Sequence, residues 1–155
     1  MARAPALWIA IADGEHARFV QPDANNVLRS MSAVDSASAH LRSRDIGSDR
    51  PGRSFESAAS AHHAVGERHD PHRLEKDRFA RFVADELNAA AAREAFDELL
   101  LVAPPRAMQE LRDALNEGTL KKLVGTLEKD LVKTPDYELW PHVKEWVGAV
   151  HRPAG

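Results

Sequence analysis

Residues 96–115 read FDELLLVAPPRAMQELRDAL and decide which fold the chain can adopt. The first half of this stretch contains an apolar run at 99–103, with acidic residues before it and prolines after it. So short an apolar run, without polar alternation, is typical of a strand buried on both faces of a sheet. Pro104 and Pro105 end such a strand because proline has no N–H to donate, and proline suits the first turn of a helix. Apolar residues then recur every three or four positions, so the stretch predicts a buried central strand that leads into a helix packed on the sheet.

The N-terminal part of the chain predicts three short strands joined by tight turns. A first strand is expected at 7–12 and a second at 17–20, and they flank Asp13-Gly14, a dipeptide that favours a hairpin turn. A second turn cluster at 22–26 precedes a weaker strand at 27–34. These three strands are expected to form an antiparallel meander.

The rest of the chain predicts two more helices and one more strand. A helical pattern covers 73–94, and the helix after the central strand is expected to end near 116–118, which reads Asn-Glu-Gly. A strand at 122–127 is expected to pair with the central strand, and Thr134 is placed to cap the last helix. We therefore predict a single α/β domain over 1–155, with a mixed sheet of about five strands packed with three main helices.

Composition excludes several classes of protein. The net charge is −3, so the whole molecule is not an electrostatic nucleic-acid binder, and such binding would need a local patch. The absence of cysteine excludes disulfides and thiolate catalysis. The apolar run at 7–12 is too short for a signal-peptide core, and no stretch has the length of a membrane span. We expect a cytoplasmic protein without a membrane partner, and no motif predicts a cofactor.

A long polar stretch at about 36–72 interrupts the pattern of strands and helices. Loops of this length inside one domain are usually functional or disordered. Gly52-Arg53-Ser54 is the first candidate for a binding tip, because glycine permits close backbone approach and arginine offers a bidentate fork to phosphate. Further arginines could add phosphate contacts; they are Arg42, Arg44, Arg50, Arg68 and Arg106. The alternative is a solvated loop whose charges cancel.

The same stretch holds the densest group of side chains that could bind a metal. They are His62, His63, His69, Asp70 and His72. Histidine with carboxylate suits zinc or another transition metal, but this spacing matches no known metal motif. Solvated histidines are the alternative, and no metal site is predicted.

Several segments together resemble a known family. These segments are IADGEHARF at 11–19, GRSFES at 52–57, FARFVADEL at 79–87, the stretch at 96–115 and LEKDL at 127–131. They resemble the host-attachment protein family, whose members are named as required for attachment to host cells. That family is similar in fold to the middle domain of archaeo-eukaryotic peptide-release factors.

The resemblance implies an order of elements and a context for the function. In the wider superfamily, a hairpin with an Asp-Gly turn leads through a third strand into a long exposed loop, a long helix and the central strand. The release-factor loop carries Gly-Gly-Gln, which enters the peptidyl-transferase centre of the ribosome. Here Gly52-Arg53-Ser54 stands in that place and no Gly-Gly-Gln occurs in the chain. The resemblance therefore implies the fold and a ribosomal or RNA context without peptide release.

Three functions follow from these observations. The first is a non-catalytic module that associates with ribosomes or RNA through the stretch at 36–72. The second is a cytoplasmic protein-interaction factor that supports attachment to host cells indirectly. The third and weakest is a metal-dependent hydrolase that uses the histidine cluster.

Overall fold

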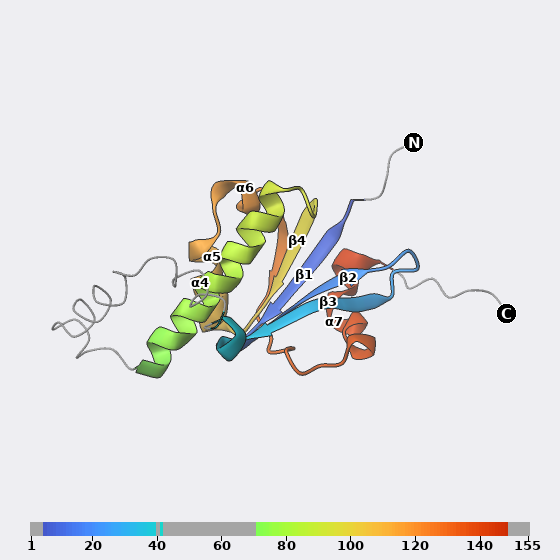
Figure 1. Ribbon diagram of the computed structural model, residues 1–155. Coiled ribbons are helices and arrows are strands. Elements are labelled where there is room, and N and C mark those ends of the chain that lie inside the picture. Colours follow the sequence, from blue (N-terminus) through green and yellow to red (C-terminus); the bar gives the residue numbers. More distant parts are fainter. Residues whose placement is uncertain (1–4, 40, 42–70, 149–155) are drawn as a thin grey trace.

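A computed structural model of the protein describes residues 5–39, 41 and 71–148 (Figure 1). The strands are β1 (Leu7–Ala12), β2 (His16–Pro22), β3 (Leu28–Asp35), β4 (Glu98–Val102) and β5 (Leu123–Leu127). The helices are α4 (Pro71–Ala92), α5 (Pro105–Ala114), α6 (Glu117–Leu120), the 3-10 helix η1 (Asp136–Glu138) and α7 (Trp140–Val147). The predicted α/β class is confirmed, with a five-stranded mixed sheet and three helices longer than two turns.

The sheet has the strand order β3-β2-β1-β4-β5. The expected meander is present, because β1 pairs antiparallel with β2 and β2 pairs antiparallel with β3. β4 pairs parallel with β1 on one side and with β5 on the other. β1 therefore occupies the middle of the sheet, and β4, which the sequence predicts as the central strand, lies one place to the side. The predicted partner strand at 122–127 is confirmed as β5.

β4 is buried on both faces, as its sequence predicts. Residues 99–103 have no exposed surface. Pro104 is the N-cap of α5 and Pro105 is its first residue, so the two prolines end the strand and begin the helix. An apolar run such as 99–103 can be buried throughout only if both faces of the sheet are covered, and the two layers of helices provide that cover.

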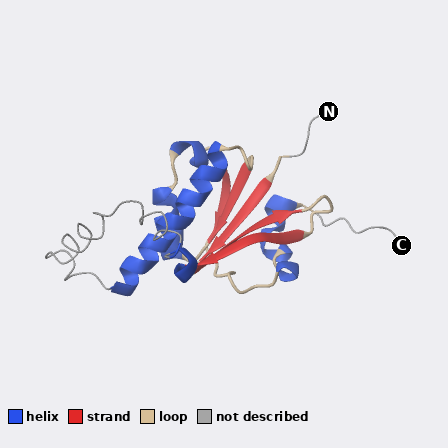
Figure 2. Cartoon of the chain, viewed as in Figure 1, coloured by secondary structure: helices blue, strands red, loops and turns tan. Residues whose placement is uncertain are grey.

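Helices cover both faces of the sheet (Figure 2). On one face, α4 and α5 pack over β1 and β4, with Phe79, Val83 and Leu87 of α4 in the core. The C-terminal part of the chain, with η1 and α7, covers the other face. Leu139 and Val143 from this part pack against the strands in a second core. The alternate residues of β1 and β4 point into one core or the other, which explains why β1 and residues 99–102 of β4 are apolar.

Gly125 of β5 allows α7 to pack directly against the sheet. A Cβ atom on this residue would lie 2.4 Å from Nε1 of Trp146, a distance that real side chains do not tolerate. The indole of Trp146 therefore fills the space above the bare backbone of β5. Trp140 anchors the other side of α7, because its Nε1–H donates to the carbonyl of Gly148 at 2.6 Å. Both tryptophans are half-buried and pack on the second core, as their helical spacing indicates.

Two predicted helix boundaries are wrong. α5 ends at Ala114, and Asn116 does not terminate it but caps the next helix, since its side chain accepts a hydrogen bond from the Thr119 N–H at 2.9 Å. Thr134 does not cap the last helix; Pro135 precedes η1, and the Thr134 carbonyl accepts a hydrogen bond from Arg18. Asparagine and threonine are compatible with several positions near helix ends, so tertiary contacts decide their role here.

The long polar stretch is shorter at its C-terminal end than the sequence predicts. α4 begins at Pro71 rather than near Arg73 and ends at Ala92. At the other end, β3 continues to Asp35 and residues 36–39 form a helical turn. Residues 42–70, which make up most of the predicted loop, lie outside the described residues.

Candidate functional site

A cleft of about 400 Å³ lies where β1 and β4 end. Its walls come from the β1–β2 turn, the start of α4 and the first turns of α5. The residues that line it are Asp13, Gly14, Glu15, Lys76, Asp77, Pro104, Arg106, Ala107 and Glu110. β1 and β4 are parallel, so their carboxyl ends meet at this edge, which is the usual ligand position in open α/β sheets. This cleft is therefore the candidate functional site.

The β1–β2 turn forms one wall of the cleft and is held by Asp13. The Oδ1 atom of Asp13 accepts hydrogen bonds from the backbone N–H groups of Glu15 at 2.8 Å and His16 at 2.6 Å. Gly14 lets α4 approach the turn, because a Cβ atom there would lie 2.7 Å from the Lys76 side chain. The sequence interpretation of Asp13-Gly14 as a hairpin turn is confirmed.

Arg106 lies on the opposite wall, in the first turn of α5. Its Nη2 atom is 3.4 Å from Oδ1 of Asp77 on α4, and the two side chains are 45% and 31% exposed. An ion pair with this exposure contributes little to stability, so the Arg106 guanidinium can exchange partners at low cost. Pro104 and Pro105 remove backbone donors that a phosphate would need at the start of α5.

The cleft carries both signs of charge with an acidic excess. Four carboxylates and two cations line it, which leaves two negative charges near neutral pH. In the part of the chain that the structure describes, neither Lys76 nor Glu110 has a hydrogen-bond or ion-pair partner. This balance suits a ligand that carries positive charge, or charges of both signs, better than a polyanion.

The structure describes one of the residues that the sequence singles out as binding groups, and this is Arg106. The following predicted residues lie outside the described part: Arg42, Arg44, Arg50, Gly52, Arg53, Ser54, His62, His63, Arg68, His69 and Asp70. His72 is in the first turn of α4, where its side chain is not described. Among the described residues, no three histidines, aspartates or glutamates are grouped so that they could hold a metal ion. The histidine cluster stays a prediction, and metal analysis of the untagged protein would test it.

One comparison with known proteins identifies the family. A family model described as "Protein required for attachment to host cells" matches residues 8–143. The chain belongs to this family. The match begins in β1 and ends in α7, so it includes the whole sheet and the cleft. No curated protein matches the chain.

This host-attachment family chain also holds a partly buried arginine that the sequence patterns did not indicate. The Arg18 side chain on β2 is 12% exposed and lies 2.9 Å from Oδ1 of Asp136, with Nη1 as donor. Its Nη2 donates to the carbonyl oxygens of Leu131, at 2.8 Å, and Thr134. Asp136 also accepts from the backbone N–H of Ser30 at 2.8 Å and from its hydroxyl at 2.6 Å. We call Arg18, Ser30 and Asp136 the arginine clamp, which ties η1 to β2 and β3.

The contacts of Arg18 explain how its positive charge is held at a partly buried position. Burial lowers the pKa of Arg18 below its ordinary value, and the charge of Asp136 opposes that shift. Arginine remains protonated because its ordinary pKa lies far above neutral pH. The clamp therefore pairs a partly buried positive charge with a carboxylate across 118 positions of sequence. Arg18, placed between Ala17 and Phe19 in the predicted second strand, was the local sequence signal that could have indicated the arginine clamp.

Proposed function

We propose that this member of the host-attachment family is a non-catalytic module that associates with ribosomes or RNA. The observation that carries the proposal is the order of the elements. An Asp-Gly hairpin, a third strand, an intervening stretch, a long helix and a buried strand follow one another, as the resemblance to release-factor middle domains implies. The resemblance implies that the stretch between β3 and α4 takes the topological place of the release-factor loop that enters the ribosome.

The chemistry of that stretch supports a contact with phosphate. Its arginines are Arg42, Arg44, Arg50, Arg53 and Arg68. Guanidinium groups bind phosphate oxygens in a bidentate manner, and Gly52 beside Arg53 permits close backbone approach. Lys76 and Asp77 of α4, the helix that follows the stretch in the sequence, line the cleft.

Co-sedimentation with purified ribosomes tests this proposal. Arg53→Ala should melt like the parent protein, because Arg53 stands in the most polar part of the sequence and its removal is expected to leave neither a cavity nor a buried charge. It should sediment less with ribosomes as salt rises, and the slope of log affinity against log salt should fall by roughly 0.7–0.9. Arg112→Ala is the matched control, since Arg112 is an exposed arginine near the end of α5 and lies outside this stretch of the sequence. A parent protein that does not sediment with ribosomes or RNA at low salt would refute the proposal.

The acidic excess of the cleft favours a second candidate, a protein-interaction factor that supports attachment to host cells. The cleft would receive a cationic segment of a partner protein, with Glu15 and Glu110 as acceptors. Fluorescence anisotropy with a lysine-rich and a glutamate-rich peptide of equal length tests it. The lysine-rich peptide should bind and Glu110→Lys should weaken it; equal affinity for both peptides would argue against this function.

The location of the protein bears on both candidates. No helix in the described part of the chain is long and apolar enough to cross a membrane. The cytoplasmic location expected from the sequence stays a prediction. Cell fractionation with an antibody against the protein would test it, and a surface location would favour a direct role in attachment.

A further inference from the structure

β5 forms one edge of the described sheet, because the strand order ends with it. Its ladder joins it to β4, and no other strand in the described part of the chain pairs with it. A strand in this position has backbone N–H and carbonyl groups on its outer side that meet no neighbouring strand. An extended segment of another molecule can therefore add to the sheet at β5.

Apolar side chains are exposed at this edge. Val124 is 42% exposed, and Leu120, which lies just before the strand, is 40% exposed. The register between β4 and β5 shifts between Leu99 and Leu100, so Val124 has no partner residue on β4. α5 supplies most of the lining of a neighbouring groove of about 390 Å³, and Leu120 and Glu128 supply the rest. The β5 edge therefore presents apolar surface to solvent in the described structure.

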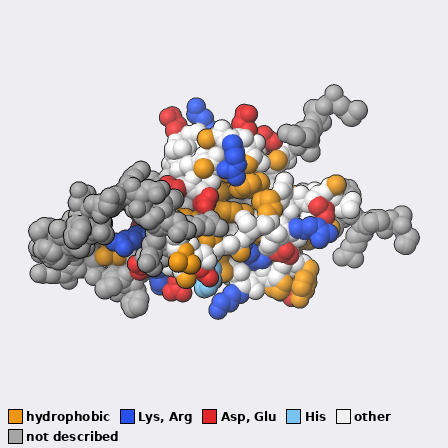
Figure 3. All heavy atoms as spheres, viewed as in Figure 1, with side chains coloured by type: hydrophobic (Ala, Val, Ile, Leu, Met, Phe, Trp, Pro, Cys, Tyr) orange, Lys and Arg blue, Asp and Glu red, His pale blue; other side chains and the backbone are white. Residues whose placement is uncertain are grey.

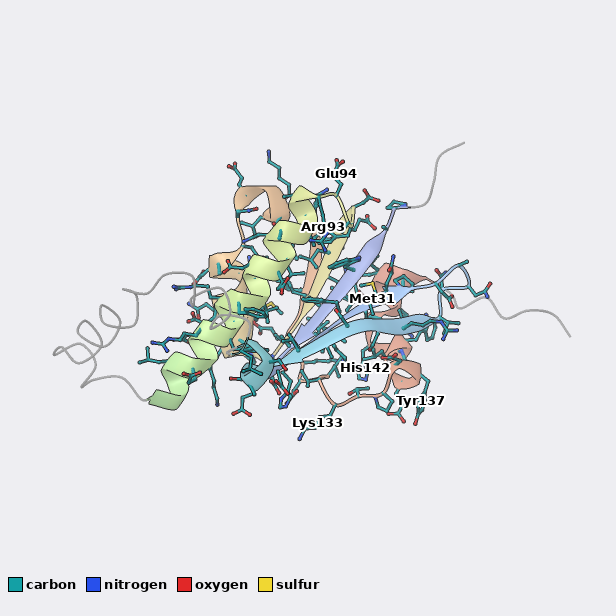
Figure 4. All side chains as sticks on the ribbon, viewed as in Figure 1. Met31, Arg93, Glu94, Lys133, Tyr137 and His142 are labelled. Carbon is teal, nitrogen blue, oxygen red and sulfur yellow. The ribbon has the colours of Figure 1, made fainter. Side chains whose placement is uncertain are left out.

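Other apolar surfaces of the described chain lie elsewhere. Figure 3 shows hydrophobic side chains gathered in the middle of one face, between α4 and the strands. Trp8, Phe19 and Val34 line a hollow on that face, and their packing against the core beneath α4 and α5 accounts for their position. Met31 of β3 and Tyr137 of η1 are also exposed, and they lie at the opposite end of the strand order (Figure 4). The apolar residues at the β5 edge are separate from both groups.

The sequence of β5 and its flanks is symmetric in chemical type. Residues 122–128 read Lys-Leu-Val-Gly-Thr-Leu-Glu, so a leucine and a β-branched residue stand on each side of Gly125 at equal distances. The two ends carry opposite charges, Lys122 and Glu128. No described residue forms a hydrogen bond or an ion pair with either of these side chains. A two-fold interface requires this kind of self-complementarity, because residue i contacts residue j and j contacts i.

We infer that two copies of the chain associate by antiparallel pairing of their β5 strands, about a two-fold axis at Gly125. This register places Lys122 of each copy opposite Glu128 of the other copy. It also places leucine opposite leucine and valine opposite threonine, and cross-strand pairs of these kinds stabilise antiparallel strands. Moving the axis to the next residue would place a leucine opposite Lys129, so the register at Gly125 is preferred. The two five-stranded sheets join into one continuous sheet.

The antiparallel arrangement fixes the relative direction of the two clefts. β1, β4 and β5 run parallel to one another, and each cleft lies where β1 and β4 end. Antiparallel pairing of the β5 strands therefore places the two clefts at opposite ends of the joined sheet. The dimer offers two separate binding sites that point in opposite directions along the strands.

Association through this edge is expected to be weak. β5 has five residues, and the register shift beside Val124 is an irregularity of the kind that shortens regular pairing. Small interfaces of this kind usually form transient complexes. We therefore expect a dimer Kd on the order of 10–100 μM.

Sedimentation velocity of the full chain at about 5–500 μM tests the inference, because this range spans the expected Kd. The weight-average sedimentation coefficient should rise from that of a monomer toward that of a dimer. Amide hydrogen exchange locates the contact. Exchange at residues 123–127 should slow as concentration rises, whereas exchange in β1, which already has a strand on each side, should not change.

Charge reversals test the register. Lys122→Glu and Glu128→Lys each place like charges opposite each other at two points of the dimer, and each should weaken dimerisation by about tenfold. The double variant restores both pairs with the charges exchanged and should recover the affinity of the parent. Lys133→Glu is the matched control, because it makes the same change of charge at an exposed residue near η1 and away from β5 (Figure 4).

Three results would overturn the dimer at β5. The first is a protein that stays monomeric at about 500 μM. The second is a dimer that both single reversals leave unchanged, since association would then use another surface. The third is a double variant that folds but does not recover the affinity. Glu128 is exposed, so Glu128→Lys should melt like the parent and tests the interface even if the half-buried Lys122 does not tolerate a reversal.

Discussion

Asp136→Ala should destabilise the protein by about 2–3 kcal/mol, more than any other surface carboxylate that the structure describes. The substitution removes the carboxylate from the arginine clamp. It leaves the Arg18 guanidinium in a site where the side chain is 12% exposed, with backbone carbonyls as its remaining partners. It also leaves the Ser30 N–H and hydroxyl without their acceptor.

The magnitude follows from the exposure of the two partners. Breaking a fully buried ion pair by removing one partner costs about 3–5 kcal/mol, because the other charge remains buried. Asp136 is 35% exposed, so water can replace part of the lost contact, and the lower figure of about 2–3 kcal/mol is appropriate. In a chain of this length that corresponds to a decrease in Tm of roughly 4–12 °C.

Urea unfolding followed by far-UV circular dichroism measures this loss. Arg29→Ala is the control, because the Arg29–Asp23 pair has a similar distance of 3.0 Å but Arg29 is 69% exposed; its removal should cost less than about 1 kcal/mol. A double-mutant cycle with Arg18→Leu isolates the coupling between Arg18 and Asp136. If Asp136→Ala unfolds within about 0.5 kcal/mol of the parent, the clamp does not stabilise the fold and the reasoning fails.

Three further predictions concern the core, the packing of α7 on β5 and the response of stability to pH. Leu101→Asp should prevent folding, because a buried unpaired carboxylate costs several kcal/mol against a total of about 5–15; a soluble protein with a cooperative melt would contradict this. Gly125→Val should lower the Tm and change tryptophan emission, since the new side chain occupies the place of Trp146; an unchanged emission spectrum would count against that packing. The hydrogen bond from Ser38 lowers the pKa of Asp35 below its ordinary 3.8, so this carboxylate stabilises the fold above about pH 4 and loses that effect as pH falls through the lowered pKa. The Tm values of the parent and Asp35→Ala should therefore differ at pH 6 and approach each other in acid, and a constant difference would show that ionisation is not involved.

The parts of the fold that the sequence predicts correctly depend on local chemistry. β4 and the start of α5 follow from an apolar run and two prolines, which act within a few residues. The position of β4 in the sheet does not follow from such signals. It depends on the pairing of Leu7 with Glu98, across 91 positions, and this places β1 rather than β4 in the middle. Strand order is therefore a tertiary property that one sequence does not reveal.

The difference between local signals and tertiary contacts also applies to the cleft and the arginine clamp. The sequence predicts Arg106 only as one of several arginines that could contact phosphate. The cleft around it also needs Lys76 and Glu110, which the fold brings together from two helices. The arginine clamp joins residues even further apart in the sequence, and Thr134, whose carbonyl also accepts from Arg18, had a plausible local role as a helix cap. Local rules assign each residue its most common role, and tertiary contacts can replace that role.

The arginine clamp also has a consequence for association between molecules. β3 is an edge strand of the described sheet, and an edge strand offers its free N–H and carbonyl groups to any other extended chain. The Ser30 N–H, which would be one such group, donates instead to Asp136, and η1 lies beside the strand at this point. A carboxylate on the strand edge repels the carbonyl oxygens of an incoming strand. Loss of Asp136 would therefore give a protein that aggregates in a concentration-dependent manner through β3, even under conditions where most molecules remain folded.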